Sequence, residues 1–300
     1  MTTPAVTTPD TTPDVTVVVA SRNRRDELLA TLPRHEAPVV LVDNASTDGS
    51  ADAVEAAAFP HVRVVRCGRN LAAAGRTLGT RLATTRYVAF ADDDSWWAPG
   101  ALARAAEVLD AHPGLALLQA RILVGPQQRT DPVCEELAAS PLPSAGLPGP
   151  RLLGFVACAA MVRRDAFLAV GGFDDVVRFP GEEERVALDL AAAGWDLAYV
   201  DDVVVHHHPS PAREDAAARA ARVSRSRLLT AVLRRPWPVV AREVRAAVAA
   251  GPVGRAGLRT ALPDVPAALR ARRRLPDDVE HQLALLAAPA PAAAQPTGSS

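Results

Sequence analysis

The chain has 300 residues, of which 49% are hydrophobic and 22% charged, and its formal net charge is −1. These values indicate a soluble globular protein with a sizeable core. No uncharged apolar run approaches the roughly 18 residues of a membrane-spanning helix, and the Thr/Pro-rich start does not resemble a signal peptide. The three cysteines, Cys67, Cys134 and Cys158, lack metal-ligand spacing, which fits a reducing cytoplasm.

Charge is distributed unevenly along the chain, and every basic residue is an arginine. Residues 212–274 hold 15 arginines and four acidic residues, whereas the residues before them are net acidic. Such a cationic segment suits an anionic surface and behaves as a separate electrostatic unit. The predicted organisation is a disordered tail (1–13), a globular domain (14–211), an Arg-rich helical extension (212–285) and a second disordered tail (286–300).

From Val15 onward, short β-branched runs alternate with helix-like stretches. Strands are predicted at 15–20, 38–43, 61–66, 86–91 and 115–124, with helices between the first four and after residue 98. This alternation predicts an α/β fold with a mostly parallel sheet and right-handed crossovers. Ligands of such sheets bind beyond the carboxyl ends of the strands. The polar turns "SRNR", "DNASTDGS", "GRN" and "DDDSWW" all fall at that edge and predict one site.

The second half of the domain is less regular. Residues 125–150 are rich in Pro, Gly and Ser and are predicted to form a long loop, after which 152–162 returns to the core. "GEEERVALDLAAAG" predicts a helix that opens with three glutamates, and "DLAYVDDVVVHHH" predicts a closing strand or hairpin.

The aspartate triplet that follows the fourth strand is the sharpest chemical feature. If the strand continues through it, Asp92 and Asp94 point to one side and Asp93 to the other. A hard divalent cation, Mg²⁺ or Mn²⁺, would relieve the repulsion between two carboxylates on one side. The alternative is an acidic turn that caps the next helix.

The other strand ends carry groups that suit a nucleotide. Ser21, Asn23 and Arg24 offer hydrogen bonds, Asp43 would accept from a base N–H or a ribose hydroxyl, and Arg76 would meet a diphosphate. Each has a plainer alternative: a polar turn, an Asx turn or a surface arginine.

Two further clusters carry candidate catalytic groups. One of Glu182, Glu183 and Glu184 would act as a general base, while the alternative is that all three favour the helix N-terminus electrostatically. One histidine of 206–208, with His206 as the candidate, would ligate the metal, and a surface histidine cluster is the alternative. The chain has no GxGxxG after the first strand, no GxxxxGK[ST] and no GxSxG, which disfavours dinucleotide oxidoreductases, P-loop enzymes and serine hydrolases.

Taken in order, the segments from Val15 to His208 resemble an inverting family 2 glycosyltransferase with the GT-A fold. The motifs that carry the resemblance are "ASRNR", "VLVDNASTDGS", "RNLAAAGRTLG", "YVAFADDDSWWAPGAL" and the block that ends in "GEEERVALDLAAAGW". A bacterial rhamnosyltransferase-like branch is a candidate subgroup, and a weaker match reaches Glu243. The implied fold is a Rossmann-like central sheet flanked by helices, with a C-terminal helical extension.

The resemblance assigns roles to individual residues. Asp92 and Asp94 hold the metal, Glu183 is the general base with Glu182 as the alternative, and Trp96 and Trp97 are candidate acceptor contacts, although helix-entry packing is the alternative for them. Glu183 stands where Asp is more usual, Ala72 where Gly is common and Thr77 where Asn is common. The implied nucleotide-sugar contacts are Ser21, Asn23, Arg24, Asp43, Asn70, Arg76, Asp92 and Asp93.

The implied reaction moves a sugar from a nucleoside diphosphate-sugar, UDP- or dTDP-linked, to a hydroxyl of a glycan, a lipid-linked saccharide or a small molecule. The expected location is the cytoplasm, at the inner face of the plasma membrane if the Arg-rich helices bind lipid, and no nucleic-acid partner is expected. One rival, a sugar nucleotidyltransferase, would need a Gly-rich, Lys-bearing loop that "SRNRRDELL" lacks. The other rival is a catalytically inactive protein on the same fold that binds a nucleotide-sugar, a membrane or another anion.

Overall fold

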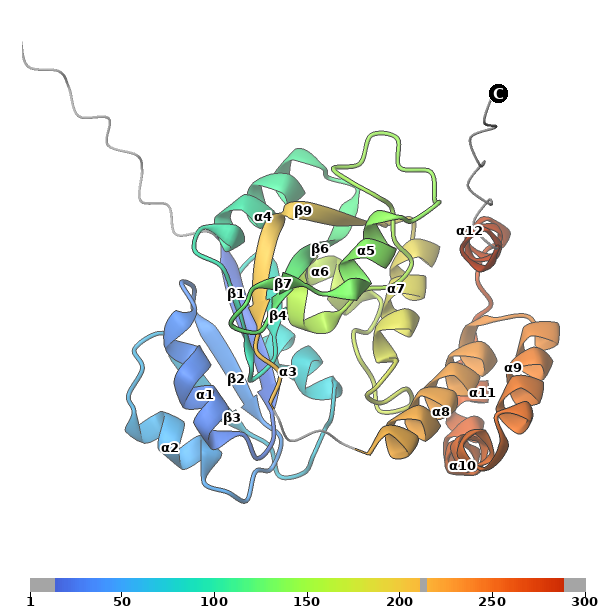
Figure 1. Ribbon diagram of the computed structural model, residues 1–300, viewed down its shortest axis with the longest axis horizontal. Coiled ribbons are helices and arrows are strands. Elements are labelled where there is room, and N and C mark those ends of the chain that lie inside the picture. The colour runs from blue at the N-terminus through green and yellow to red at the C-terminus, as the bar shows by residue number, and fades with distance from the viewer. Residues whose placement is uncertain (1–13, 211–214, 289–300) are drawn as a thin grey trace, which may run out of the picture.

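The computed structural model describes residues 14–210 and 215–288 and is built around a nine-stranded sheet (Figure 1). Its first half is the parallel set β3-β2-β1-β4, formed by Val62–Arg66, Val39–Asp43, Val15–Ser21 and Tyr87–Ala91. The β-branched runs of β1 and β2 are buried along their whole length except Ala20, as expected for parallel strands covered on both faces. These four strands confirm the predicted α/β fold.

The second half of the sheet mixes strand directions. β8 (Ala160–Arg163) pairs antiparallel with β4 and with β6 (Leu115–Val124), and β6 pairs parallel with β9 (Asp196–His207). β5 (Ser95–Trp97) pairs antiparallel with β9, and β7 (Arg129–Thr130) pairs with β6. The pairing with β9 brings β5, which directly follows the aspartate triplet, beside the histidines at the end of the chain's last strand.

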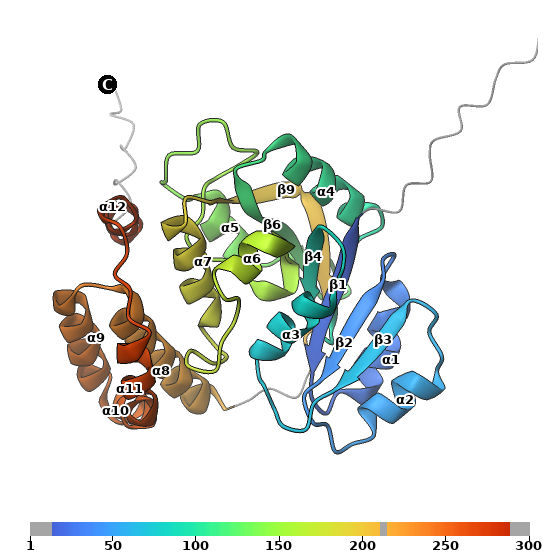
Figure 2. The ribbon, with the colours of Figure 1, turned by 180° about the vertical axis from the view of Figure 1, so that it is seen from behind.

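Helices flank the sheet, as Figure 2 shows from behind. α3 packs on β1 and β2 so closely that a Cβ at Gly79 would lie 2.5 Å from Val18 Cγ1. The helices of this part of the chain are α1 (Arg25–Thr31), α2 (Ser50–Ala56), α3 (Ala74–Leu82), α4 (Ala101–Ala111), α5 (Pro132–Ala138), α6 (Arg164–Ala169) and α7 (Glu182–Ala192). Short 3-10 turns lie at Leu32–Arg34, Ala157–Ala159 and Leu262–Asp264.

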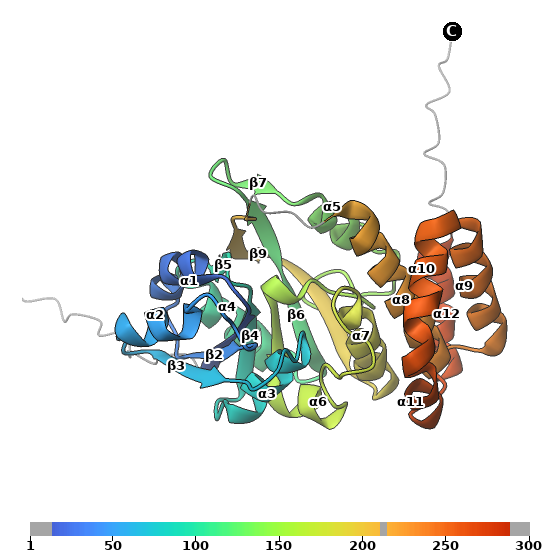
Figure 3. The same cartoon turned by 90° about the horizontal axis from the view of Figure 1, so that it is seen from below.

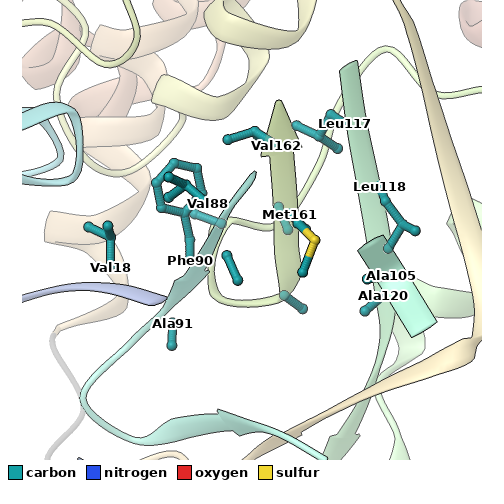
Figure 4. Close-up of a cluster of buried hydrophobic side chains, with 14 of the residues drawn as sticks. Val18, Val88, Phe90, Ala91, Ala105, Leu117, Leu118, Ala120, Met161 and Val162 are labelled. Carbon is teal, nitrogen blue, oxygen red and sulfur yellow. The ribbon is translucent and has the colours of Figure 1, made fainter. Parts of the chain in front are cut away.

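The main core lies where β4, β8 and β6 run side by side (Figure 4). Phe90, Met161 and Leu118 are fully buried there, and Phe90 also contacts Phe167 and Phe173 with ring centroids 5.3 and 5.8 Å apart. Because the strand that precedes the aspartates is anchored in this core, the position of the triplet is held rigidly.

The predicted loop over 125–150 is wrong for two stretches, of which the first is the short strand β7. Residues 132–138 form α5, whose N-cap is Asp131: its carboxylate accepts a hydrogen bond from the Val133 N–H at 3.0 Å. An Asp followed by Pro at the first helical position is a helix-start signal that the surrounding Pro and Gly residues obscured.

The C-terminal helices form a group of their own beside α7 (Figure 3). They are α8 (Ala216–Arg234), α9 (Trp237–Ala249), α10 (Gly251–Ala261), α11 (Val265–Arg270) and α12 (Asp277–Ala287). Arg234 of α8 joins them to α7 through an ion pair with Asp189. Among the described helices, none has the length and apolarity needed to cross a bilayer. Most residues of the two predicted tails lie outside the described ranges.

Candidate active site

The carboxyl ends of the parallel strands meet at one edge of the sheet. Ser21 and Asp43 are register partners at the ends of β1 and β2, and the aspartate triplet begins one residue after β4 ends at Ala91. Ser21 Oγ donates a hydrogen bond to Asp93 Oδ2 at 2.7 Å, so the first and fourth strand ends are joined directly. The structure thus brings these predicted residues together.

The triplet does not continue the strand, so the expected alternation of its side chains does not hold. The chain turns at Asp93 and Asp94, with the Ser95 N–H bonded to the Asp92 carbonyl at 3.3 Å, so strand alternation no longer applies. The three carboxylates diverge: Asp92 meets Arg76, Asp93 meets Ser21, and Asp94 meets the end of β9.

Asp93 and Asp94, the two residues at which the chain turns, have different electrostatic environments. Burial raises the pKa of Asp93 to about 7, although Ser21 and Arg24 oppose the rise. Burial also acts to raise the pKa of Asp94, but the hydrogen bond and charge of His207 outweigh it, and the pKa of Asp94 lies below its usual value. The backbone N–H of Ser210 adds a donor to Asp94 at 3.3 Å. Asp94 is therefore ionised at neutral pH, whereas Asp93 is partly protonated.

Arg76 connects the triplet to the acidic start of α7. Its guanidinium is buried, pairs with Asp92 and lies 3.7 Å from Glu182 Oε1. Burial opposes its charge, but Asp92 and Glu182 hold the pKa of Arg76 above the usual value. Arg76 was predicted to meet a diphosphate; in this structure both ends of its guanidinium face carboxylates instead. The sequence alone did not reveal this bridge, because its partners lie 16 and 106 positions away along the chain.

The three glutamates of α7 are not equivalent. Glu182 is fully buried, and within the described residues neither of its carboxylate oxygens has a hydrogen-bond partner. Burial, followed by the charge of Glu183, raises the pKa of Glu182 to about 8, against the opposing effect of Arg76. Glu182 therefore carries a proton at neutral pH. Glu183 and Glu184 are partly exposed, and burial raises the pKa of Glu184.

The histidine beside the triplet is His207 and not the predicted His206. In the β5–β9 ladder Ser95 is opposite His207, whose Nε2 lies 3.4 Å from Asp94 Oδ1. His206 pairs with Trp96 and stacks on its indole with ring centroids 5.3 Å apart. Alternation along β9 sends the two histidines to opposite sides, so the candidate metal ligand is His207. Asp94 raises the pKa of His207 against the effect of burial.

The two tryptophans of β5 lie in different environments. Trp97 is 2% exposed, and its Nε1 donates to the Phe90 carbonyl at 3.0 Å, so it is a core residue that an acceptor does not reach in this conformation. Trp96 is covered by His206 and by the guanidinium of Arg34, whose Cζ lies 4.2 Å from the ring centroid. Trp97 therefore packs in the core, as the alternative to acceptor binding predicted. Trp96 lies between the imidazole of His206 and the guanidinium of Arg34.

Several predicted nucleotide contacts also build the turns that carry them. Asn23 accepts from the Thr47 N–H and Asn70 from the Ala72 N–H, both at 2.8 Å. Asp43 Oδ2 accepts from the Ser46 N–H at 3.2 Å, while its buried Oδ1 has no partner among the described residues. Asp43 Oδ1 is thus an acceptor still available to a ligand at the end of β2.

One residue that fixes this edge was not singled out from the sequence. Asn44 is buried, donates to the Ala72 carbonyl at 3.1 Å and accepts from the Leu71 N–H at 3.3 Å. It ties the end of β2 to the turn before α3, where a Cβ on Gly75 would lie 3.0 Å from Asn44 Oδ1. A polar residue directly after a buried strand was the signal available for it.

The donor atoms at this edge suit a hard cation when a ligand completes the set. Asp92 and Asp94 supply carboxylate oxygens, the donors that Mg²⁺ and Mn²⁺ prefer, whereas His207, whose Nε2 lies 3.4 Å from Asp94 Oδ1, would be a ligand only in its neutral form. Within the described residues, however, no group of three or more His, Cys, Asp or Glu side chains is arranged to hold a metal ion. The residues present therefore fit a cation that is shared with a bound diphosphate better than one held by protein alone.

Comparison with known proteins identifies the family. The family model "Glycosyl transferase family 2" matches residues 16–171, which is more than half of the chain and contains the strand ends described above. The chain belongs to glycosyl transferase family 2. This confirms the predicted family and enzyme class.

Two curated bacterial proteins are similar in sequence. An N-acetylglucosaminyl-diphospho-decaprenol L-rhamnosyltransferase of Mycobacterium tuberculosis is 28% identical over 258 residues, covering 71% of this chain and 81% of that protein. The succinoglycan biosynthesis protein ExoO of Rhizobium meliloti is 35% identical over 109 residues, covering 34% of this chain and 31% of its own length. The match to ExoO therefore spans about a third of each protein.

Solved structures share the fold. The mannosyltransferase PcManGT from Pyrobaculum calidifontis, in complex with GDP-Man and Mn²⁺, superposes with a TM-score of 0.57 at 22% identity, covering 92% of this chain and 86% of that one. TarS 1-349 of S. aureus, in complex with UDP-GlcNAc, gives 0.57 at 15% identity and covers 89% and 83%. These likenesses confirm the predicted GT-A fold.

Proposed function

We propose that this glycosyltransferase moves a sugar from a nucleoside diphosphate-sugar to a hydroxyl acceptor with inversion at the anomeric carbon. One observation carries the proposal: Arg76 pairs with Asp92 and lies 3.7 Å from Glu182. A single guanidinium thus holds the donor-side carboxylates and the acidic start of α7 next to each other. Direct displacement needs this juxtaposition, because the acceptor oxygen that the base deprotonates must attack the same carbon from which the diphosphate leaves.

The donor nucleotide would lie along the carboxyl ends of β1 and β2. Asp43 Oδ1, which is buried and has no partner among the described residues, would accept a hydrogen bond from the base or ribose. Asn23, Asn70 and their turns would shape the pocket around it. The fold neighbours in complex with GDP-Man and UDP-GlcNAc support a nucleotide-sugar donor, and we propose a UDP- or dTDP-sugar for this chain.

A divalent cation, Mg²⁺ or Mn²⁺, would be held by Asp94 and Asp92, with His207 as the nearest nitrogen donor. When bound, it would supply positive charge to the departing diphosphate. Asp94 is prepared for this role because His207 and the Ser210 N–H keep it ionised. The complex of PcManGT with Mn²⁺ supports the choice of metal class.

Glu183 is the proposed general base. Its neighbour Glu182 is fully buried and holds a proton at neutral pH, so it neither reaches an acceptor nor accepts a proton. Glu183 occupies the next position in the first turn of α7 and is partly exposed. It would take the proton of the acceptor hydroxyl as that oxygen attacks.

The acceptor is proposed to be a saccharide in the synthesis of a cell-wall or other polysaccharide. The relatives named as a lipid-diphosphate rhamnosyltransferase and a succinoglycan biosynthesis protein support this class. We also propose a cytoplasmic location, because the implied reaction would use its nucleoside diphosphate-sugar in that compartment.

The experiment that tests the proposal is release of nucleoside diphosphate from a panel of nucleoside diphosphate-sugars, measured with and without Mn²⁺ or Mg²⁺. We expect metal-dependent release of nucleoside diphosphate with one donor. When water takes the place of the sugar acceptor, we expect the release to continue at a slower rate. Proton NMR of the transferred sugar would then report its anomeric configuration. Absence of release with every donor would reject the proposal, and retention of configuration would reject the displacement mechanism.

A further inference from the structure

A groove that the predicted catalytic residues do not use runs through the C-terminal helices. It has a volume of about 480 Å³ and lies between α8 and α9, with α10 as its floor. Most of the lining is small and apolar, and the polar exceptions are Arg219, Arg227, Ser224 and Glu243. Figures 1 and 3 show α8 between α7 and the α9–α10 pair, so the groove adjoins the part of the chain that carries the catalytic glutamates.

The sequence of these helices explains why the groove is there. A Cβ on Gly254 would collide with the Ala247 carbonyl, and one on Gly257 would lie 2.5 Å from the Ala221 carbonyl. The two glycines therefore let α9 and α8 both press against α10. Where α8 and α9 then face each other, alanines such as Ala220 and Ala246 are too short to fill the space between them.

The polar residues of the groove favour an anion. Within residues 14–210 and 215–288, neither Arg219 nor Arg227 has a carboxylate within ion-pair distance. The acidic lining residue, Glu243, lies 3.8 Å from Arg242 and is thereby partly neutralised. An apolar floor with arginines along one wall is complementary to an amphiphile that has an apolar chain and an anionic head.

The groove connects to the catalytic edge at two points. Arg219 lies over the ring of Phe179 at 5.5 Å, and Phe179 precedes Glu182 by three residues and is 43% exposed. On the other side, the charges of Arg227 and Glu243 act on Glu184 in the first turn of α7. A molecule seated in the groove with its head near Arg219 would present that head, and any group attached to it, toward the glutamates.

We propose that this groove binds the apolar chain of an anionic, phosphate-bearing lipid acceptor, with Arg219 and Arg227 contacting the phosphate. The inference rests on the proposed transfer to a hydroxyl acceptor and narrows its substrate class to lipid phosphates. The sugar-accepting hydroxyl would lie beyond the phosphate, toward Glu183. The groove thus accounts for part of the cationic extension that the proposed catalytic chemistry leaves without a role.

The test is calorimetric binding of dodecyl phosphate to the full chain, below the concentration at which it forms micelles. Dodecyl maltoside supplies the chain without the charge, and inorganic phosphate supplies the charge without the chain. We expect dodecyl phosphate to bind at least about tenfold more tightly than either. Equal affinity for inorganic phosphate, or for dodecyl maltoside, would overturn the proposal.

Groove-filling variants locate the binding. Ala220→Phe and Ala246→Phe place a ring in the groove from exposed positions, whereas Ala217→Phe and Ala249→Phe add the same ring to exposed positions outside the lining. The first pair should raise the Kd for dodecyl phosphate at least about tenfold, and the second pair should leave it within about twofold of the wild type. Equal effects in both pairs would overturn the assignment to the groove.

Charge variants test the head-group contact. Arg219→Gln and Arg227→Gln should weaken dodecyl phosphate binding but not dodecyl maltoside binding, and Arg245→Gln, outside the lining, should change neither. Sedimentation provides a further outcome: a wild-type dimer that Ala246→Phe converts to a monomer would identify a second copy as the occupant and overturn the lipid proposal. Metal-dependent release of nucleoside diphosphate to water does not involve the groove, so its presence or absence judges the proposed function separately.

Discussion

Glu182 gives the protein a pH-dependent stability that a single substitution should remove. Its pKa is about 8 in the folded chain, compared with an ordinary value of 4.5, because burial disfavours its charge. Between these two values the folded state keeps a proton that the unfolded state releases, so the unfolded state binds fewer protons and stability falls as pH rises. One pKa unit corresponds to about 1.4 kcal/mol, so the loss between pH 4.5 and 8 is on the order of 4 kcal/mol.

Glu182→Gln keeps the size of the side chain and cannot ionise. We expect the variant and the wild type to have similar free energies of unfolding near pH 5, and the variant to become the more stable of the two as pH approaches 9. Urea denaturation of the full chain, followed by circular dichroism at pH 5, 6.5, 8 and 9, measures the difference. Glu107→Gln, at an exposed position of α4, controls for the loss of a glutamate charge.

Parallel pH profiles for Glu182→Gln and the wild type would refute this reasoning. They would mean that Glu182 ionises in the folded protein about as readily as in the unfolded chain, and hence that it is hydrated or fully compensated by Arg76. The argument that Glu182 is too firmly protonated to be the base would then fail as well.

The remaining predictions concern the same cluster. Asp94→Asn should lower metal-dependent release of nucleoside diphosphate at least about 100-fold, because it removes the ionised carboxylate that we propose holds the metal. Glu183→Gln should lower transfer about 10²- to 10⁴-fold while calorimetry shows donor affinity within about threefold of wild type. Arg76→Gln should destabilise the fold by about 3–5 kcal/mol in urea denaturation, because Asp92 loses its partner in the ion pair, and at pH 9, where Glu182 ionises, adding Glu182→Gln should restore part of the loss.

For each of these variants, one result would contradict the prediction. Full metal-dependent release by Asp94→Asn would remove Asp94 from the metal site. Undiminished transfer by Glu183→Gln, with Glu184→Gln as the matched control, would move the base to another residue of the first turn. Strict additivity of Arg76→Gln and Glu182→Gln would show that the two side chains do not interact, despite the 3.7 Å between them.

The parallel half of the sheet could be predicted from the sequence because its signals are local. Val15–Ser21 and Val39–Asp43 are runs of β-branched residues whose burial follows from their composition, and each ends in a polar residue. Since parallel strands place their carboxyl ends at one edge, Ser21, Asp43 and the triplet had to meet there.

The details of the site depend on pairings that the local sequence does not contain. His207 lies next to Asp94 because β9 pairs with β5 in one particular register, and a shift of one residue would have presented His206 instead. Trp97 is a core residue because its indole finds the Phe90 carbonyl. Strand alternation does not place Asp92 and Asp94, because the chain turns at Asp93 and Asp94.

The charge balance of the cluster supports the choice of base independently of sequence resemblance. Five carboxyl groups gather where isolated charges would be costly, and four of them are compensated. Asp92 pairs with Arg76, Asp93 bonds to Ser21 and is partly protonated, Asp94 meets His207, and Glu182 is protonated beside Arg76. The fifth, Glu183, is partly exposed; it interacts with the protonated Glu182, and no ion pair with a basic side chain is found for it among the described residues. A general base needs a carboxylate that an acceptor can reach and that no cation holds, and in this cluster that description fits Glu183.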